Sequence, residues 1–174
     1  MEYYILLQDE RVMNYAEPIG LSKVINRDFV RNADIEALNT DPVMVYIKEK
    51  DECEYIDIID RPVLLISDKI KQVFDMFEKE GFYKPVVFGD PKHMETHLYH
   101  LVIPKKVDCL SRLSEFNPDD TIKRLVLDSN KLRGEHIFSV KGIHECFIIV
   151  DLDVVENIIR SDYIGIKLKK VEVH

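Results

Sequence analysis

The clearest hydrophobic pattern in the chain lies in residues 61–88, where an apolar strand leads into an amphipathic helix and then a second strand. Val63 to Ile66 form an apolar run, and Ser67 follows with a hydroxyl that can cap a helix. The apolar positions after it recur at the three-and-four spacing of one buried helix face: Ile70, Val73, Phe74 and Phe77. We expect Gly81 to end this helix in the left-handed conformation, with an extended run from Tyr83 to Phe88 after it.

Residues 147–173 repeat this order at a fixed offset of 84 positions without gaps. Under this offset Ser67 corresponds to Asp151, another capping residue, and Gly81 corresponds to Gly165. Two interpretations stay open. The segments are copies of one duplicated unit, or they are alike only because any capped helix between two strands follows the same backbone rules.

Further apolar runs predict strands at 3–7, 43–47, 98–103, 122–127 and 137–140. Residues 11–42 are weakly patterned, and we expect only short helical turns there, around 22–25 and 34–38. Seven or eight strands with two main helices predict an α+β fold. We expect a largely antiparallel sheet with both helices packed on one face, built from two similar strand-helix-Gly-strand units.

The chain length of 174 residues suits a single domain, 1–174. We divide it into an acidic, weakly patterned N-terminal elaboration (1–60) and a core (61–174).

The formal net charge of −8 is concentrated in the first half of the chain. Residues 1–88 hold 11 basic and 18 acidic side chains, whereas residues 89–174 hold 13 and 14. Binding to a nucleic acid backbone needs a basic surface, so we expect no nucleic acid partner. The acidity favours steering toward a basic partner, although solubility alone also explains it.

Several features favour a cytoplasmic protein without a membrane partner. No apolar run approaches the ~20 residues that span a bilayer, and the start MEYYILLQDE lacks the basic region of a secretory signal. The three cysteines, Cys53, Cys109 and Cys146, lie far apart without a CxxC pair. We therefore expect free thiols rather than a disulfide framework.

The segment HMETHLYH is the strongest candidate for chemistry. On a helix, His93, His97 and His100 would share one face and bind a metal. The alternation that begins at Leu98 instead indicates a strand, which places His97 and His100 on opposite faces. A small-ligand- or metal-binding domain or enzyme that uses these histidines is the alternative function.

Other catalytic signatures are absent from the sequence. It contains no GxGxxG, P-loop or GxSxG motif. Cys146 follows His144 by two positions, as a nucleophile near a base would, but its place at an apolar strand indicates a small buried hydrophobe. We expect no enzymatic activity and no cofactor.

Four segments carry a resemblance to a known family: VLLISDKIKQVF, LYHLVIPKKVDCLS, IKRLVLD with IFSVKG, and IIVDLDVVENIIRSDYIGIKL. In their order, from about Asp60 to Val173, the chain resembles a bacterial family of immunity proteins from polymorphic toxin systems. Ser111 departs from the pattern, at a place where the family's second acidic residue is expected. The resemblance implies a non-enzymatic protein that binds and neutralises a cognate protein toxin.

The charge pattern suggests where such a partner would bind. The densest acidic segment precedes Arg61, and two tyrosines lie in or beside it as aromatic anchors. The expected partner-binding residues are Glu49, Asp51, Glu52, Glu54, Asp57, Asp60, Tyr46 and Tyr55. A homodimer also stays open, because exposed edge strands can pair with a second copy.

Overall fold

The computed structural model describes residues 1–174 and contains two main β-sheets. The six-stranded sheet has the order β10 (Val126–Leu127), β13 (Ile166–Val173), β1 (Tyr3–Gln8), β12 (Ile148–Asp151), β11 (Ile137–Val140) and β7 (Lys106–Val107). The five-stranded sheet has the order β2 (Val43–Tyr46), β5 (Gly81–Asp90), β6 (Glu95–Pro104), β4 (Leu65–Ser67) and β3 (Ile58–Ile59). A separate pair joins β8 (Glu115–Phe116) to β9 (Ile122–Arg124).

Five short α-helices complete the fold. They are α1 (Leu21–Val24), α2 (Arg27–Arg31), α3 (Ile35–Leu38), α4 (Asp68–Asp75) and α5 (Leu152–Arg160), with one 3-10 turn at Ser129–Lys131. The predicted α+β class with largely antiparallel strands is confirmed. The strands are divided between two main sheets, where the sequence pattern suggested one.

The two sheets have the same connectivity around their central strands. In one, β4-α4-β5 places β4 and β5 on either side of β6, and in the other β12-α5-β13 places β12 and β13 on either side of β1. In each sheet the strand that follows the helix also pairs with a parallel strand on its outer side. β2 pairs with β5 in one sheet, and β10 pairs with β13 in the other. The bounds of the two β-α-β segments agree within one residue at the offset of 84. This arrangement supports a duplicated unit, which stays a prediction.

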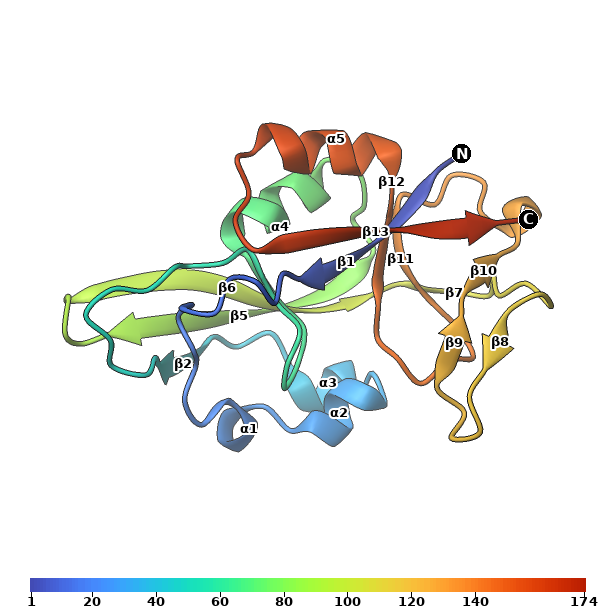
Figure 1. Cartoon of the computed structure of the whole chain (residues 1–174). Helices are drawn as coiled ribbons and strands as arrows, with labels where there is room; N and C mark the ends of the chain where they lie inside the picture. Colours follow the sequence, from blue (N-terminus) through green and yellow to red (C-terminus); the bar gives the residue numbers. More distant parts are fainter.

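One hydrophobic core joins the sheets through α4 and α5, which lie side by side above both sheets in Figure 1. We call the following buried residues the shared core: Leu6, Ile58, Leu64, Ile66, Ile70, Val73, Phe74, Val102, Ile137, Ile148, Val150, Val154, Val155, Ile158 and Ile166. The opposite face of the five-stranded sheet packs against residues of α1 and α3, and that of the six-stranded sheet against Cys109 and Leu132.

The two main helices begin where the sequence predicted and end earlier than predicted. Ser67 and Asp151 cap them by accepting hydrogen bonds from the backbone N–H groups of Ile70 (3.3 Å) and Val154 (3.1 Å). Gly81 and Gly165 were wrongly predicted as helix stops, because α4 ends at Asp75 and α5 at Arg160. After α5 the first left-handed residue is Asp162, at φ 55°, so the helix has already ended before Gly165.

The predicted short helical turns are present as α1 and α3. The three cysteines are free, as predicted, but Cys146 is exposed in the loop before β12 rather than buried in the strand. None of the helices has the length and apolar character needed to cross a bilayer.

Candidate functional site

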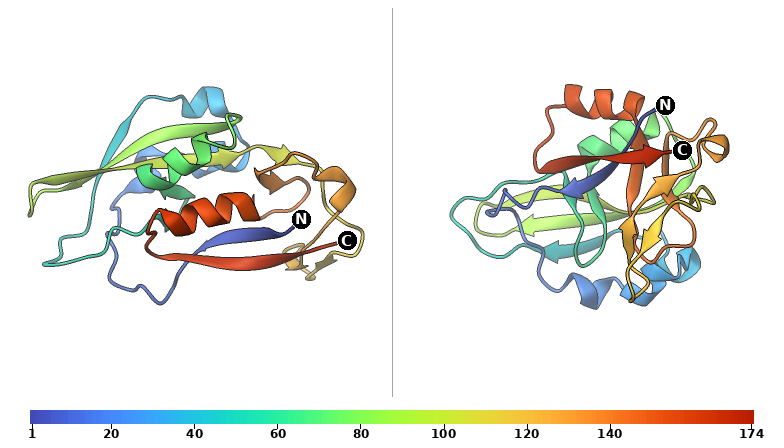
Figure 2. Two further views of the ribbon diagram at one scale, coloured as in Figure 1. Left: turned by 90° about the horizontal axis from the view of Figure 1, so that it is seen from above. Right: turned by 45° about the vertical axis from the view of Figure 1, so that its right-hand side comes forward.

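The β5–β6 hairpin projects from the body of the molecule, and the segment between β2 and β3 runs beside it (Figure 2, left). We call residues 90–95 the hairpin tip and residues 48–55 the acidic loop. Lys92 of the tip forms ion pairs with Glu49 and Asp51 of the loop. The fold therefore brings together the acidic segment and part of the histidine segment, which the sequence offered as separate candidates.

Four carboxylates of the acidic loop face solvent: Glu49, Asp51, Glu52 and Glu54. Lys92 pairs with two of them, Glu49 and Asp51, and the hydrogen bond that it donates lowers the pKa of Asp51. Lys50 of the same loop turns instead toward Glu17, at 2.9 Å. The loop surface therefore keeps a net negative charge that a basic partner can meet.

The other two predicted acids lie apart from this surface. Asp57 is only 3% exposed, and its carboxylate accepts hydrogen bonds from the Ser67 hydroxyl (2.6 Å) and the backbone N–H of Ile164 (2.6 Å). Asp60 is half-buried and accepts a hydrogen bond from the backbone N–H of Gln8, at 3.3 Å. Both side chains connect parts of the framework, so we leave them out of the candidate surface.

The two predicted tyrosines occupy different environments. Tyr55 is half-buried, stacks on His97 with ring centroids 3.5 Å apart, and donates a hydrogen bond to Asp90. Burial raises its pKa. Tyr46 is 57% exposed and lies over Gly89, where an added Cβ would come within 3.1 Å of the tyrosine ring. Tyr46 is therefore free to contact a partner, whereas Tyr55 holds the acidic loop against β6.

Tyr46 belongs to an apolar surface that the sequence did not identify. Strand pairing places Met44, Val87 and Leu98 in one row across β2, β5 and β6, on the face opposite the buried Val45. Met44 is 50% and Leu98 41% exposed. We call Met44, Tyr46, Val87 and Leu98 the uncovered sheet face. The alternation in 43–47 predicted that Met44 and Tyr46 share a face, but not that this face lacks a covering layer.

The three predicted histidines do not converge on one centre. His93 Nδ1 lies 2.7 Å from Asp90, and this hydrogen bond raises the pKa of His93. His97 stacks on Tyr55, whereas His100 lies on the opposite face of β6 with its Nε2 2.9 Å from Asp68 of α4. Strand alternation predicted this separation, and the geometry does not favour a shared metal site.

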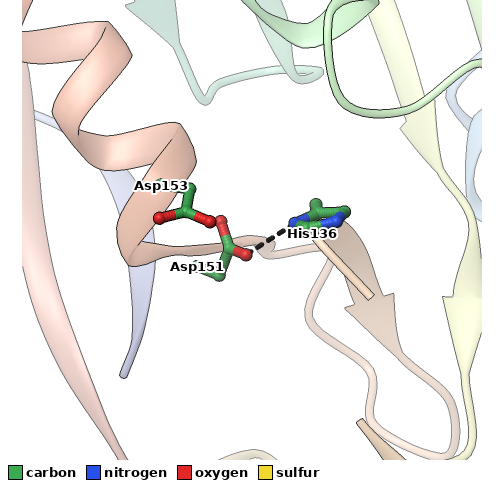
Figure 3. A group of neighbouring side chains, drawn as sticks. All are labelled: His136, Asp151 and Asp153. Atoms are coloured by element: carbon green, nitrogen blue, oxygen red, sulfur yellow. Dashed lines mark hydrogen bonds and ion pairs between the residues drawn. The ribbon is translucent and has the colours of Figure 1, made fainter. Parts of the chain in front are cut away.

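One other cluster has metal-ligand chemistry: His136, Asp151 and Asp153, whose ligand atoms lie within 4.8 Å of one another (Figure 3). Both oxygens of Asp151 already accept hydrogen bonds, one from the backbone N–H of Val154 (3.1 Å) and one from His136 (2.6 Å). The positive end of α5 also disfavours a cation. In the other sheet the capping residue Ser67 is held in the same way by Asp57. The cluster is therefore explained as a device that fixes the start of the helix.

The comparison with known proteins gives one family. A protein-family model, described as "Immunity protein family (Imm11)", matches residues 6–173, which is nearly the whole chain. No curated protein sequence matches.

Proposed function

Because the chain belongs to the immunity protein family Imm11, we propose that it neutralises a cognate bacterial toxin by binding it at the acidic loop, the hairpin tip and the uncovered sheet face. The family indicates an immunity function, a toxin as partner and a non-enzymatic role. The observation that carries the proposed location is the gathering of four exposed carboxylates at the end of a projecting hairpin.

The two parts of this surface have different roles in binding. The carboxylates attract a basic toxin surface, such as that of a toxin that cleaves nucleic acid, and accelerate its association. Met44, Tyr46 and Leu98 supply apolar area that loses water on contact, and aromatic anchors of this kind carry much of the energy in protein interfaces. Charge then sets the association rate, while the apolar side chains slow dissociation.

The test measures association of the protein with its cognate toxin by stopped-flow kinetics. Reversing the loop charges with Glu49→Lys, Asp51→Lys, Glu52→Lys and Glu54→Lys should slow association about tenfold or more at low salt and flatten its salt dependence. A matched variant reverses Glu10, Glu36, Asp108 and Glu156, which are exposed acids on other elements. It changes the net charge equally and should slow association much less.

A second variant tests the uncovered sheet face. Tyr46→Ala should raise the dissociation rate about tenfold, as loss of an interface anchor does, and leave association nearly unchanged. Unchanged kinetics in both the four-site and the Tyr46 variants, with the toxin still bound, would place the interface elsewhere on the molecule.

The alternative function at the histidines is not favoured by the geometry, since the three side chains lack a common centre. Metal analysis of the purified protein tests it directly, and stoichiometric zinc that is lost on His97→Ala would support it. The cytoplasmic location and a homodimer stay predictions. Sedimentation at several concentrations would test the dimer.

A further inference from the structure

A cleft of about 430 Å³ lies where the two sheets meet, at the other end of β6 from the hairpin tip. It is lined by α2, the segment that leads into β4, the end of β6, and the loop that leads into β12. Glu95 of the tip and Pro104 of the cleft are nine positions apart on β6, which at about 3.3 Å per residue is roughly 30 Å. The cleft is therefore separate from the proposed toxin-binding surface.

The floor of the cleft is apolar and incompletely covered. Leu7, Val30, Ile103 and Phe147 line it from four different segments, and all four are only half-buried. The cleft volume falls within the roughly 300–1,000 Å³ of small-molecule sites. An apolar body of modest size can thus displace water from these side chains.

The rim of the cleft is basic, although the whole chain carries a net charge of −8. Arg27, Arg31, Arg61 and Lys106 line it, and all four are exposed. Arg27 and Lys106 form no ion pair. Arg31 and Arg61 have only distant partners, Asp28 at 3.8 Å and Asp60 at 4.0 Å.

The two acids that line the cleft offset the charge of this rim only in part. Asp60 accepts a hydrogen bond from the backbone N–H of Gln8, and Glu145 accepts one from the backbone N–H of Ile122, at 2.7 Å. The four cations from α2, Arg61 and β7 outnumber the two carboxylates that line the cleft, Asp60 and Glu145. The cleft therefore keeps a positive potential that an anion from solution can meet.

We propose that this cleft binds a small anionic amphiphile, a molecule with an aliphatic or aromatic body and a carboxylate or phosphate group. The body lies on Leu7, Val30, Ile103 and Phe147, and the anion meets the arginines of the rim, which pair with carboxylate and phosphate in a forked geometry. The proposal does not rest on toxin binding, because it concerns the opposite end of β6.

Isothermal titration calorimetry of the full chain with sodium decanoate tests the proposal. Decanoate should bind with one-to-one stoichiometry. Decanol should bind at least tenfold more weakly because it lacks the charge, and inorganic phosphate should bind at least tenfold more weakly because it lacks the apolar body. Absence of saturable decanoate binding, equal binding of decanol, or equal binding of phosphate would each overturn the proposal.

Two double variants of equal net charge separate the effect of local contacts at the rim from the effect of the overall electrostatic field of the protein. Arg27→Glu with Arg31→Glu should weaken decanoate binding at least tenfold. Lys167→Glu with Lys169→Glu changes exposed cations of β13, outside the cleft, and should leave the affinity within about twofold. Equal weakening by both pairs would show a nonspecific charge effect and overturn the assignment.

The reactivity of Cys146 reports where decanoate binds, and this measurement needs no variant of the rim residues. It lines the cleft and is exposed, whereas Cys109 is buried. In a Cys53→Ser background, saturating decanoate should slow the reaction of Cys146 with a thiol reagent at least fivefold. An unchanged reaction rate at saturation would place the bound decanoate elsewhere and overturn the proposal.

Discussion

The carboxylate of Asp57 holds three parts of the chain together. It accepts hydrogen bonds from the hydroxyl of the α4 cap, Ser67, and from the backbone of Ile164 between α5 and β13. Lys69 of α4 approaches the same carboxylate at 2.9 Å. Because Asp57 is buried, removal of its carboxylate would leave the Ser67 hydroxyl and the Ile164 N–H without this partner. Lys69 is partly exposed and also donates to the backbone oxygen of Asp162, so it would lose less.

Asp57→Ala should lower the free energy of unfolding by about 3 kcal/mol. Hydrogen bonds to a charged group contribute roughly 1.5–3 kcal/mol each, and rearrangement of the donors around the missing carboxylate recovers only part of this loss. Urea denaturation measures the change. The matched variant is Glu52→Ala, which removes an exposed acid of the same segment and should stay within about 0.5 kcal/mol of the wild type. A similar small effect for both variants would contradict the structural role of Asp57.

Composition identified the acidic segment, but it did not separate its structural acids from its surface acids. Asp57 stands between Ile56 and Ile58, and an acid flanked by apolar residues on both sides was the available signal of burial. No comparable signal linked Asp51 to Lys92, because the contact joins two loops that are distant in sequence. The charge of the candidate site was predictable, whereas its shape was not.

The loop from α5 to β13 passes close to the segment that leads into β3. Gly165 has φ 73°, and a Cβ added there would lie 2.6 Å from the Cβ of Ile56 and 2.5 Å from its Cγ2. Ile56 immediately precedes the buried Asp57 in the segment that leads into β3. Gly165 therefore allows the α5–β13 loop of one sheet to pack on the segment that leads into β3 of the other sheet. It does not end a helix.

Gly165→Ala should cost about 1–2 kcal/mol for the left-handed conformation and a further 1–3 kcal/mol for the clash with Ile56. Gly134→Ala is the control, because Gly134 has φ 78° and no atom within 4 Å of an added Cβ. Thermal unfolding of both variants isolates the steric part as the difference between them. Equal destabilisation would mean that the loop moves away from Ile56 at no cost.

Elements with strong periodicity were predicted well, whereas short elements were predicted unevenly, since the turns α1 and α3 were expected and α2 was not. The strands at 3–7, 43–47 and 137–140 were recognised because their apolar positions alternate or run continuously over at least four residues. The five-residue helix α2 was missed because it has no buried residue, so its sequence lacks the apolar stripe that marks a helix. The run 122–127 is two short strands, β9 and β10, which lie in different sheets.

Taken as a whole, the molecule depends on the shared core, in which both sheets and both main helices meet. α4 packs on β4 and β6, α5 packs on β12 and β1, and the two helices pack on each other, which joins the two sheets. That the chain forms a single domain stays a prediction, and it has a direct physical test. If it is correct, both sheets should unfold in a single cooperative transition.

Ile158→Ala tests this cooperativity. Ile158 is fully buried in α5, so its truncation should cost about 2–5 kcal/mol. Hydrogen exchange should show the loss equally in β6 and in β12, although α5 connects strands of only one sheet. Loss of protection confined to the six-stranded sheet would show two independently unfolding units.

The sequence predicted the class of the fold but not how the strands are divided between its sheets. Pairing of β1 between β12 and β13 joins residues at opposite ends of the chain, and no local pattern encodes such a pairing. The shared order of the two sheets became visible only once these partners were known. Residues 1–60, predicted as an elaboration, include this central strand and β2 at a sheet edge.

The central position of β1 has a consequence for biosynthesis. Residues 3–8 leave the ribosome early, yet their partners are residues 148–151 and 166–173. At about 5–20 residues per second, the strand waits roughly ten to thirty seconds before β13 has been synthesised. A nascent chain therefore exposes this apolar strand until β12 and β13 have been synthesised, and the centre of the six-stranded sheet cannot form before then.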